Sequence, residues 1–193
     1  MLAEQIHIMT EEEYLEMERR SEIKHEYHQG ELFSMAGASG NHNLIVANII
    51  RDLGIQLKRR CKVYPSDIKI KIKNTGRFVY PDVTVVCGKE KYFDNAKDVL
   101  LDADLIVEVL SDSTELYERS DKFAYYRKLD SFKEYLLVSQ KKKKIEKFLK
   151  NESGFWKISE AGENDPEIII ESLGCALNIE DIYDFVVFEN LKE

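Results

Sequence analysis

The most constraining feature of the sequence is an apolar run, LIVEVL at residues 105–110, that a single charged residue, Glu108, interrupts. Such a run predicts a central β-strand that is covered on both faces of its sheet. Burying a lone carboxylate costs several kcal/mol unless it is ion-paired, hydrogen-bonded or bound to a metal. Glu108 therefore needs a partner, and it is the first candidate functional residue.

A second acid, Asp82, lies in the strand-like segment YPDVTVV. Pro81 cannot donate a ladder hydrogen bond, so it predicts a kink or a strand start that presents Asp82 at a sheet opening. Two carboxylates at neighbouring strand ends would form an oxygen site suited to magnesium or manganese. The alternative is that both acids are solvent-exposed or ion-paired.

The rest of the chain predicts short elements around this strand. Thr10 and Glu13 have the spacing of a capping box, and a Gln29-Gly30 turn between KHEYH and ELFSMA predicts a hairpin. Ser39 or Asn41 can cap a helix that is apolar on most of its circumference, and we therefore expect most of this helix to be buried. A helix over 115–129, four further strands (EYLLVSQ, KKIEKFLK, GFWKIS, EIIIES) and a closing helix (IEDIYDF) complete the pattern. We predict one α/β (α+β) domain over residues 1–193, with helices flanking a mixed sheet and a strand-rich C-terminal part.

Charge is unevenly distributed along the chain. The net charge is −8, yet residues 58–77 contain eight basic residues and one acid, and residues 140–150 contain six and one. Isoleucines alternate with lysines over 68–73, which predicts a strand with one core face and one basic face in water. Lys69, Lys71, Lys73 and Arg77 are therefore candidate phosphate-binding residues; the alternative is a merely solvated strand face.

Other classes of protein fit the sequence poorly. The three cysteines, Cys61, Cys87 and Cys175, are odd in number and far apart, so we expect small buried side chains and no disulfide framework. No apolar run approaches a membrane span, and the acidic N-terminal segment is unlike a signal peptide, so we expect a cytoplasmic protein. Neither a GxSxG nucleophile motif nor a GxxxxGK phosphate loop is present.

Pro81-Asp82, followed after 26 positions by Glu108 in an apolar strand, resembles the core of PD-(D/E)xK nucleases. With the further stretches EYHQGELFSMAGASGNHN, ERSDKFAYYRKLDSFKEYLLV and LGCALNIEDIYD, the chain is similar to the Uma2 (DUF820) family of restriction-endonuclease-like proteins. The resemblance implies a restriction-endonuclease-like fold in which Asp82 and Glu108 hold magnesium or manganese. It also implies hydrolysis of nucleic acid, with DNA as the expected substrate.

The motif's lysine, two residues after the glutamate, is replaced by Leu110. The resemblance offers Lys122 instead, on a helix face shared with Arg119 and Tyr126, and Glu31 as an additional acid. We predict a metal-dependent endonuclease with Asp82, Glu108, Lys122 and Glu31 at its catalytic site. The alternative is a catalytically inactive module that binds nucleic acid or protein, and the strand-rich tail could form a homodimer.

Overall fold

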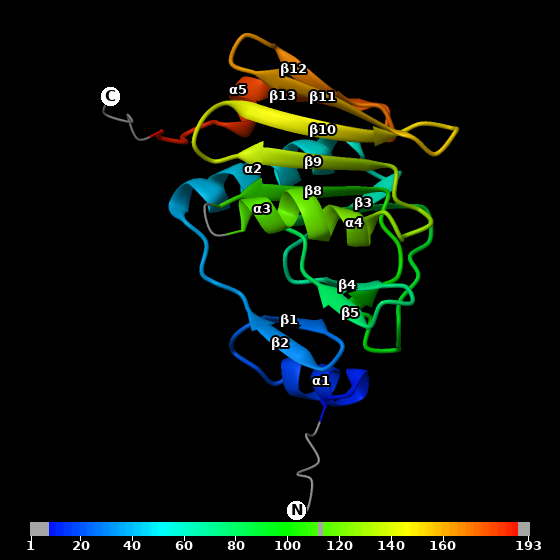
Figure 1. The fold of residues 1–193 in the computed structure, drawn as a ribbon. Helices are drawn as coiled ribbons and strands as arrows, with labels where there is room; N and C mark the ends of the chain where they lie inside the picture. The colour runs from blue at the N-terminus through cyan, green and yellow to red at the C-terminus, as the bar shows by residue number, and fades with distance from the viewer. Residues whose placement is uncertain (1–7, 112–113, 189–193) are drawn as a thin grey trace, which may run out of the picture.

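The computed structural model describes residues 8–111 and 114–188, and its centre is a six-stranded mixed sheet (Figure 1). The sheet order is β11-β10-β9-β8-β6-β3, in which β8 and β9 are parallel and the other neighbours are antiparallel. Its strands are β3 (Cys61–Pro65), β6 (Val83–Cys87), β8 (Leu105–Leu110), β9 (Glu134–Ser139), β10 (Lys144–Lys150) and β11 (Trp156–Gly162). Every residue of β8 is buried, which confirms the predicted central strand.

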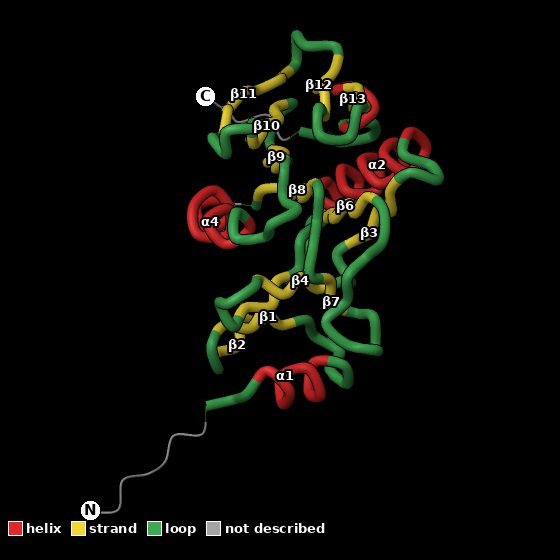
Figure 2. The backbone as a smooth tube through the Cα atoms, turned by 90° about the vertical axis from the view of Figure 1, so that its right-hand side faces the viewer, coloured by secondary structure: helices red, strands yellow, loops and turns green. Residues whose placement is uncertain are grey.

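A second sheet of five strands, in the order β2-β1-β5-β4-β7, lies beside the first (Figures 1 and 2). Its strands are β1 (His25–His28), β2 (Glu31–Ser34), β4 (Lys69–Ile72), β5 (Arg77–Val79) and β7 (Val99–Leu100). Helix α1 (Glu11–Glu18) packs on its outer face through a cluster that includes Tyr14, Tyr27 and Phe78. The isoleucines of β4 pack on the other side, in the core shared with β6 and β8.

Helical segments cover both faces of the six-stranded sheet (Figure 2). Helix α2 (Gly40–Gln56), the β12–β13 ribbon (Glu167–Ile170 and Cys175–Asn178) and α5 (Ile179–Ile182) share one core with this sheet. On the opposite face a helical segment consists of α3 (Glu115–Tyr117), a π-helical turn η1 (Glu118–Lys122) and α4 (Phe123–Tyr126). The single regular helix predicted over 115–129 is therefore wrong in detail. The mixed sheets and flanking helices agree with the predicted fold class.

Local sequence signals explain where several elements begin. The Thr10 hydroxyl accepts from the Glu13 amide at 3.2 Å and the Glu13 carboxylate accepts from the Thr10 amide at 2.8 Å, which confirms the capping box. Gln29 and Gly30 both have positive φ, as the tight β1–β2 turn requires. Ser39 caps α2. This helix is buried on one side only, because Leu44 and Ile55 are 38% and 69% exposed, so the prediction of burial around most of its circumference is wrong.

Pro81 separates two strands that the sequence suggested could be one. β5 ends at Val79 and belongs to the five-stranded sheet, whereas β6 begins at Val83 in the six-stranded sheet. The chain therefore changes sheets across Tyr80-Pro81-Asp82, consistent with the missing ladder donor of proline. The break leaves Asp82 at the junction between the sheets.

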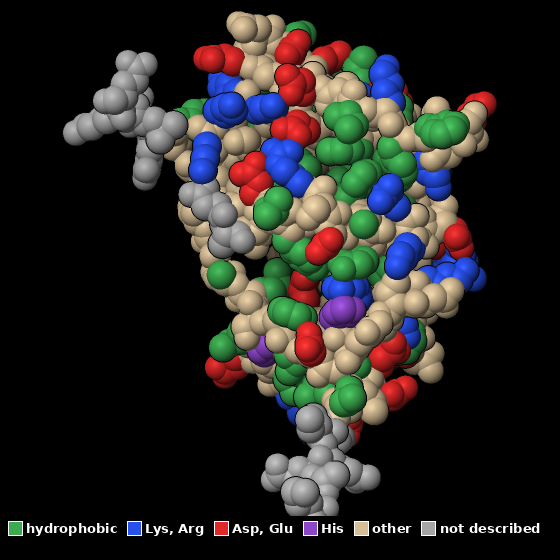
Figure 3. All heavy atoms as spheres, viewed as in Figure 1, with side chains coloured by type: hydrophobic (Ala, Val, Ile, Leu, Met, Phe, Trp, Pro, Cys, Tyr) green, Lys and Arg blue, Asp and Glu red, His purple; other side chains and the backbone are tan. Residues whose placement is uncertain are grey.

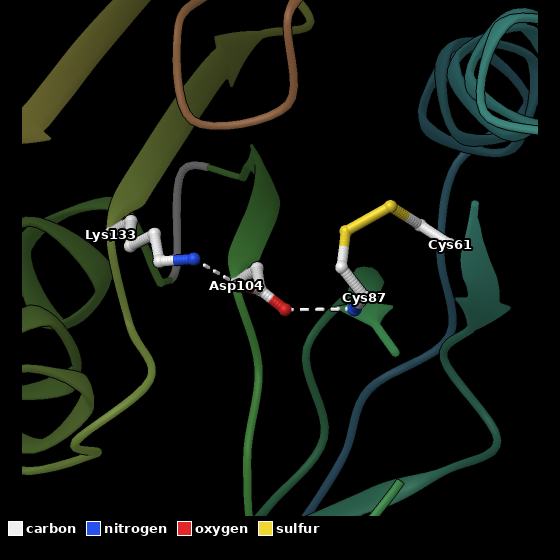
Figure 4. The surroundings of a disulfide bond; sticks show 4 residues. All are labelled: Cys61, Cys87, Asp104 and Lys133. Atoms are coloured by element: carbon white, nitrogen blue, oxygen red, sulfur yellow. Dashed lines mark hydrogen bonds and ion pairs between the residues drawn. A yellow bond between two sulfur atoms is a disulfide. The ribbon is translucent and has the colours of Figure 1, made fainter. Parts of the chain in front are cut away.

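The expectation that the cysteines form no disulfide is wrong. Cys61 of β3 and Cys87 of β6 are directly opposite in the antiparallel register and form a disulfide, with Cα atoms 4.1 Å apart (Figure 4). The Cys87 amide donates to the Asp104 carboxylate at 2.8 Å, and Lys133 donates to the same carboxylate at 2.7 Å. Sequence spacing alone could not predict this pair, because strand pairing brings together residues that are 26 positions apart. Cys175 is free.

The strand-rich tail buries some of its large apolar side chains and exposes others. Phe148 and Trp156 pack in the core beneath α4, whereas Phe155 and Ile169 are 72% and 53% exposed. The homodimer stays a prediction. None of the described helices has the length and apolar character that crossing a membrane requires. The interpretation of the N-terminal segment rests partly on residues 1–7, which lie outside the described residues, as do Asp112 and Ser113.

Candidate functional site

Asp82 and Glu108 lie side by side where β6 and β8 meet. The antiparallel register places Val83 opposite Val107, so Asp82, just before Val83, and Glu108, just after Val107, are brought together. The Val109 amide donates to Asp82 Oδ2 at 2.7 Å, and the Asp82 amide donates to Glu108 Oε2 at 3.3 Å. Each carboxylate is therefore held by the backbone of the other strand, and both side chains are buried.

Lys122 reaches these acids from the π-helical turn. Its Nζ lies 2.9 Å from Glu108 Oε1 and 3.4 Å from Glu26 Oε1, and it donates to the Tyr80 carbonyl at 3.4 Å. The side chain is only 5% exposed. Short π-helical turns occur frequently at functional sites because they change the direction in which successive side chains point. Lys122, from the neighbouring helical segment, thus lies against Glu108, whose own strand has Leu110 where the nuclease motif has a lysine.

Tyr126 joins the same cluster, but Arg119 does not. The Tyr126 hydroxyl donates to Glu108 Oε1 at 2.7 Å. Arg119 instead forms ion pairs with Glu115 and Glu146 on the outside of the helical segment. The predicted face of Arg119, Lys122 and Tyr126 assumed regular α-helical spacing, which the π-helical turn does not follow.

Glu26 is a site residue that the sequence analysis missed. Its carboxylate accepts from the Tyr80 amide at 3.1 Å and from the Tyr117 hydroxyl at 3.3 Å, in addition to its contact with Lys122. Side chains alternate between the two faces of a strand, and Tyr27 of β1 faces the core under α1. Its neighbour Glu26 must therefore face the opposite side, which was the available signal. Glu31 was predicted instead. It lies opposite His28 at the turn, and its side chain is exposed.

His42 and Glu118 complete the surroundings of Asp82. His42 Nε2 lies 3.1 Å from Asp82 Oδ2, while its backbone amide donates to the Ser39 hydroxyl oxygen at 3.1 Å, so His42 contacts Asp82 and also takes part in the cap of α2. Glu118, in the first position of the π-helical turn, is 5% exposed. Within the described residues, His42 Nδ1 and Glu118 Oε2 are buried without a hydrogen-bond partner.

Burial controls the protonation of this cluster. It raises the pKa of Glu108 to about 8; Lys122 opposes the shift, and the charges of Asp82 and Glu118 add to it. Burial likewise raises the pKa of Glu118. For Lys122, burial disfavours the ammonium form, but Glu108, Glu26 and Glu118 outweigh it and raise its pKa well above that of free lysine. Strongly shifted groups of this kind concentrate at functional sites.

The chemistry of these residues fits a divalent cation. Asp82 and Glu108 bring together carboxylate oxygens, the ligands that magnesium and manganese prefer. The partnerless Glu118 oxygen is a buried acceptor that an ion or its water could satisfy. Within residues 8–111 and 114–188, no group of three or more histidine, cysteine or acidic residues has a metal-binding arrangement. This does not exclude magnesium, which is commonly held by one or two carboxylates and completed by water and substrate phosphate.

The basic strand does not present the expected face to water. Lys69 is 4% exposed, pairs with Asp98 at 3.0 Å and lies over the Tyr80 ring. Lys71 pairs with Glu11 of the covering helix α1. The prediction of a solvated basic strand is therefore wrong for these two lysines, because α1 and the loop before β7 cover that side of β4.

Lys73 and Arg77, the other two predicted phosphate ligands, are more accessible. Lys73 is exposed and pairs with exposed Asp130 at 3.2 Å. The guanidinium of Arg77 stacks 3.6 Å above the ring of Tyr125. Their proposed contact with nucleic acid stays a prediction.

Comparison with known proteins gives a consistent result. A model of the Uma2 family, described as "Putative restriction endonuclease", matches residues 11–180. The uncharacterized Synechocystis sp. protein sll1609 is 35% identical over 159 residues, which cover 81% of this chain and 90% of the relative. A second Synechocystis sp. protein, slr1290, also uncharacterized, is 34% identical over 181 residues, 93% of this chain and 94% of the relative.

The fold is also found in a solved structure. A crystal structure from Anabaena variabilis, described as a "putative nuclease belonging to DUF820", superposes with a TM-score of 0.75 at 15% identity and covers 93% of this chain and 99% of that one. At this identity the likeness concerns the fold, which is thus restriction-endonuclease-like. With the family model spanning most of its length, the chain belongs to the Uma2 family.

Proposed function

We propose that this protein is a metal-dependent endonuclease that hydrolyses phosphodiester bonds of DNA. The observation that carries the proposal is the contact of Lys122 Nζ with Glu108 Oε1 at 2.9 Å, beside Asp82. Through this contact Lys122 provides, from the helical segment, the positive charge that strand β8 lacks because Leu110 stands at the lysine position of the motif. Membership of a family described as restriction endonucleases supports the same reaction class.

In the proposed reaction, Asp82 and Glu108 would hold magnesium or manganese, which would supply positive charge to polarise the scissile phosphate and to lower the pKa of an attacking water. His42 contacts the Asp82 carboxylate, and the Val109 amide donates to the same carboxylate, so Asp82 is oriented before substrate arrives. The raised pKa of Lys122 keeps its ammonium charged at neutral pH, where it can stabilise the negative charge that develops on the phosphate.

Tyr126 and Glu26 position the two reacting side chains. Tyr126 donates to the Glu108 oxygen that also contacts Lys122, and Glu26 contacts the same ammonium from β1. The site therefore combines residues of both sheets and of the helical segment between them. No covalent enzyme intermediate is needed, because water is the nucleophile.

The direct test is cleavage of supercoiled plasmid DNA with magnesium or manganese, and with EDTA as the metal-free reference. We expect nicking or linearisation that EDTA abolishes and that Asp82→Asn and Glu108→Gln both lose. Asp104→Asn is a matched control, because Asp104 is about as buried as Asp82 but lies just before the N-terminal end of β8, away from Glu108. Metal-independent DNA binding without cleavage by the unmodified protein would instead identify an inactive binding module.

A further inference from the structure

The β9–β10 hairpin carries a second concentration of basic residues, Lys141 to Lys144, that the proposed reaction does not use. Lys141 and Lys142 are exposed, and Lys143 and Lys144 are partly exposed. Figure 1 places this hairpin at the same edge of the molecule as the start of α2 and the C-terminal end of β8, and Figure 3 shows basic side chains gathered there.

Hydrogen bonds connect the hairpin to the candidate site. Gln140 Nε2 donates to the Leu110 carbonyl at 2.8 Å, at the end of the strand that carries Glu108. The Ser39 hydroxyl, which caps the helix of His42, donates to Gln140 Oε1 at 2.6 Å. The hairpin is therefore attached to both elements that surround the two metal-site carboxylates.

The distance from the site suits a nucleic-acid backbone. Leu110 lies beside Ser139 in the parallel register. Leu110 is two positions beyond Glu108, and Lys141 is two positions beyond Ser139, which at a rise of roughly 3.3 Å per residue is about 13 Å in total. Along a DNA duplex this corresponds to about four base pairs at a rise of roughly 3.4 Å per base pair. A phosphate held near the site would thus bring its neighbours over the hairpin.

The acids near the hairpin do not prevent such binding. Lys143 pairs with Glu180, which is 70% exposed, and Lys144 pairs with exposed Glu160. Exposed ion pairs of this kind contribute about 0–1 kcal/mol, so a DNA phosphate can replace the carboxylates. The lysines of β4 differ, because Lys69 is buried in its pair with Asp98.

We propose that the β9–β10 hairpin, through Lys141, Lys142 and Lys143, is the surface that holds the phosphate backbone of duplex DNA next to the catalytic site. The inference rests on the proposed function and deepens it. It assigns DNA contact to the basic segment 140–150 rather than to the basic residues of β4.

The test is the salt dependence of binding to a fluorescent DNA duplex of about 30 base pairs, roughly three helical turns, in EDTA so that no cleavage occurs. Replacing Lys141, Lys142 and Lys143 with Gln should flatten the slope of log affinity against log salt by up to about 2.7 units. The matched control replaces Lys58, Arg60 and Lys89 with Gln; all three are exposed, and they follow the C-terminal ends of α2 and β6, at the other end of the sheet. Its slope should equal that of the unmodified protein.

An unchanged slope in the hairpin variant, with the unmodified protein binding and cleaving DNA, overturns this surface and leaves the proposed function intact. A slope change seen only with an RNA duplex of the same length also overturns it. Failure of the unmodified protein to cleave any DNA, by contrast, removes the proposed function. Circular dichroism melting of both variants establishes that they remain folded.

Discussion

Replacement of Lys122 by Met should remove most cleavage activity while leaving the substrate contacts in place. Met approximates the volume of the lysine stem but has no ammonium, and the native ammonium lies 2.9 Å from Glu108 and is almost fully buried. Removing one buried electrostatic group of this kind lowers turnover about 100-fold to 1,000-fold, or about 2.7–4 kcal/mol. Because Lys122 acts on the transition state, the affinity for manganese should change far less.

The same replacement should also destabilise the metal-free protein. Lys122 contacts Glu108 and Glu26, and breaking a buried ion pair by removing one partner costs about 3–5 kcal/mol. The assay is therefore single-turnover plasmid cleavage at saturating manganese, with urea unfolding measured in parallel. Lys128→Met, an exposed lysine just after α4, is the control.

Partial rescue distinguishes the charge from its geometry. Lys122→Arg should recover only part of the activity, since a planar guanidinium presents its charge differently from a compact ammonium. Leu110→Lys, added to Lys122→Met, should raise activity by restoring the lysine to the strand position. Cleavage by a folded Lys122→Met variant within about threefold of the unmodified rate, a difference of about 0.7 kcal/mol, would refute the role given to this lysine.

Three further predictions follow from other contacts. Glu26→Gln should lower turnover about tenfold, or about 1.4 kcal/mol. It should also move the alkaline limb of the pH–rate profile to lower pH, because Glu26 raises the pKa of Lys122, and the control Glu31→Gln should change neither turnover nor the profile. The pKa of Glu108 is raised from 4.5 to about 8 in the folded protein, so the stability of the metal-free protein should fall as the pH rises from 4.5 to about 8. Over the same range the affinity for manganese, measured by calorimetry, should rise, and it should level off above about pH 8. Dithiothreitol or Cys61→Ser should lower the free energy of unfolding in urea by about 3.5 kcal/mol, as expected for a closed loop of roughly 26 residues, whereas Cys175→Ser should have little effect.

Sequence patterns predicted the features that depend on neighbouring residues. The capping box at Thr10, the β1–β2 turn, the Ser39 cap and the buried strand of Glu108 each follow from local chemistry. The break at Pro81 also follows, because proline lacks a ladder donor. Asp82 and Glu108 could therefore be proposed together before any strand pairing was known.

The features that sequence could not provide depend on which layers meet. The disulfide required the register of β3 and β6, and the burial of Lys69 and Lys71 required the packing of α1 over β4. Glu118 lies at the site because the π-helical turn departs from the regular helical spacing assumed for residues 115–129. Glu26 lies on a strand of the other sheet, so its contact with Lys122 depends on the packing of the two sheets.

The most direct test of the central claim is an anomalous-scattering map from crystals soaked in manganese. The account predicts a single strong peak between the carboxylates of Asp82 and Glu108, at oxygen distances of roughly 2.0–2.6 Å, that is absent from crystals of Asp82→Ala. A peak elsewhere, or none at saturating manganese in a crystal form that leaves the site open to solvent, would contradict the assignment of the metal site.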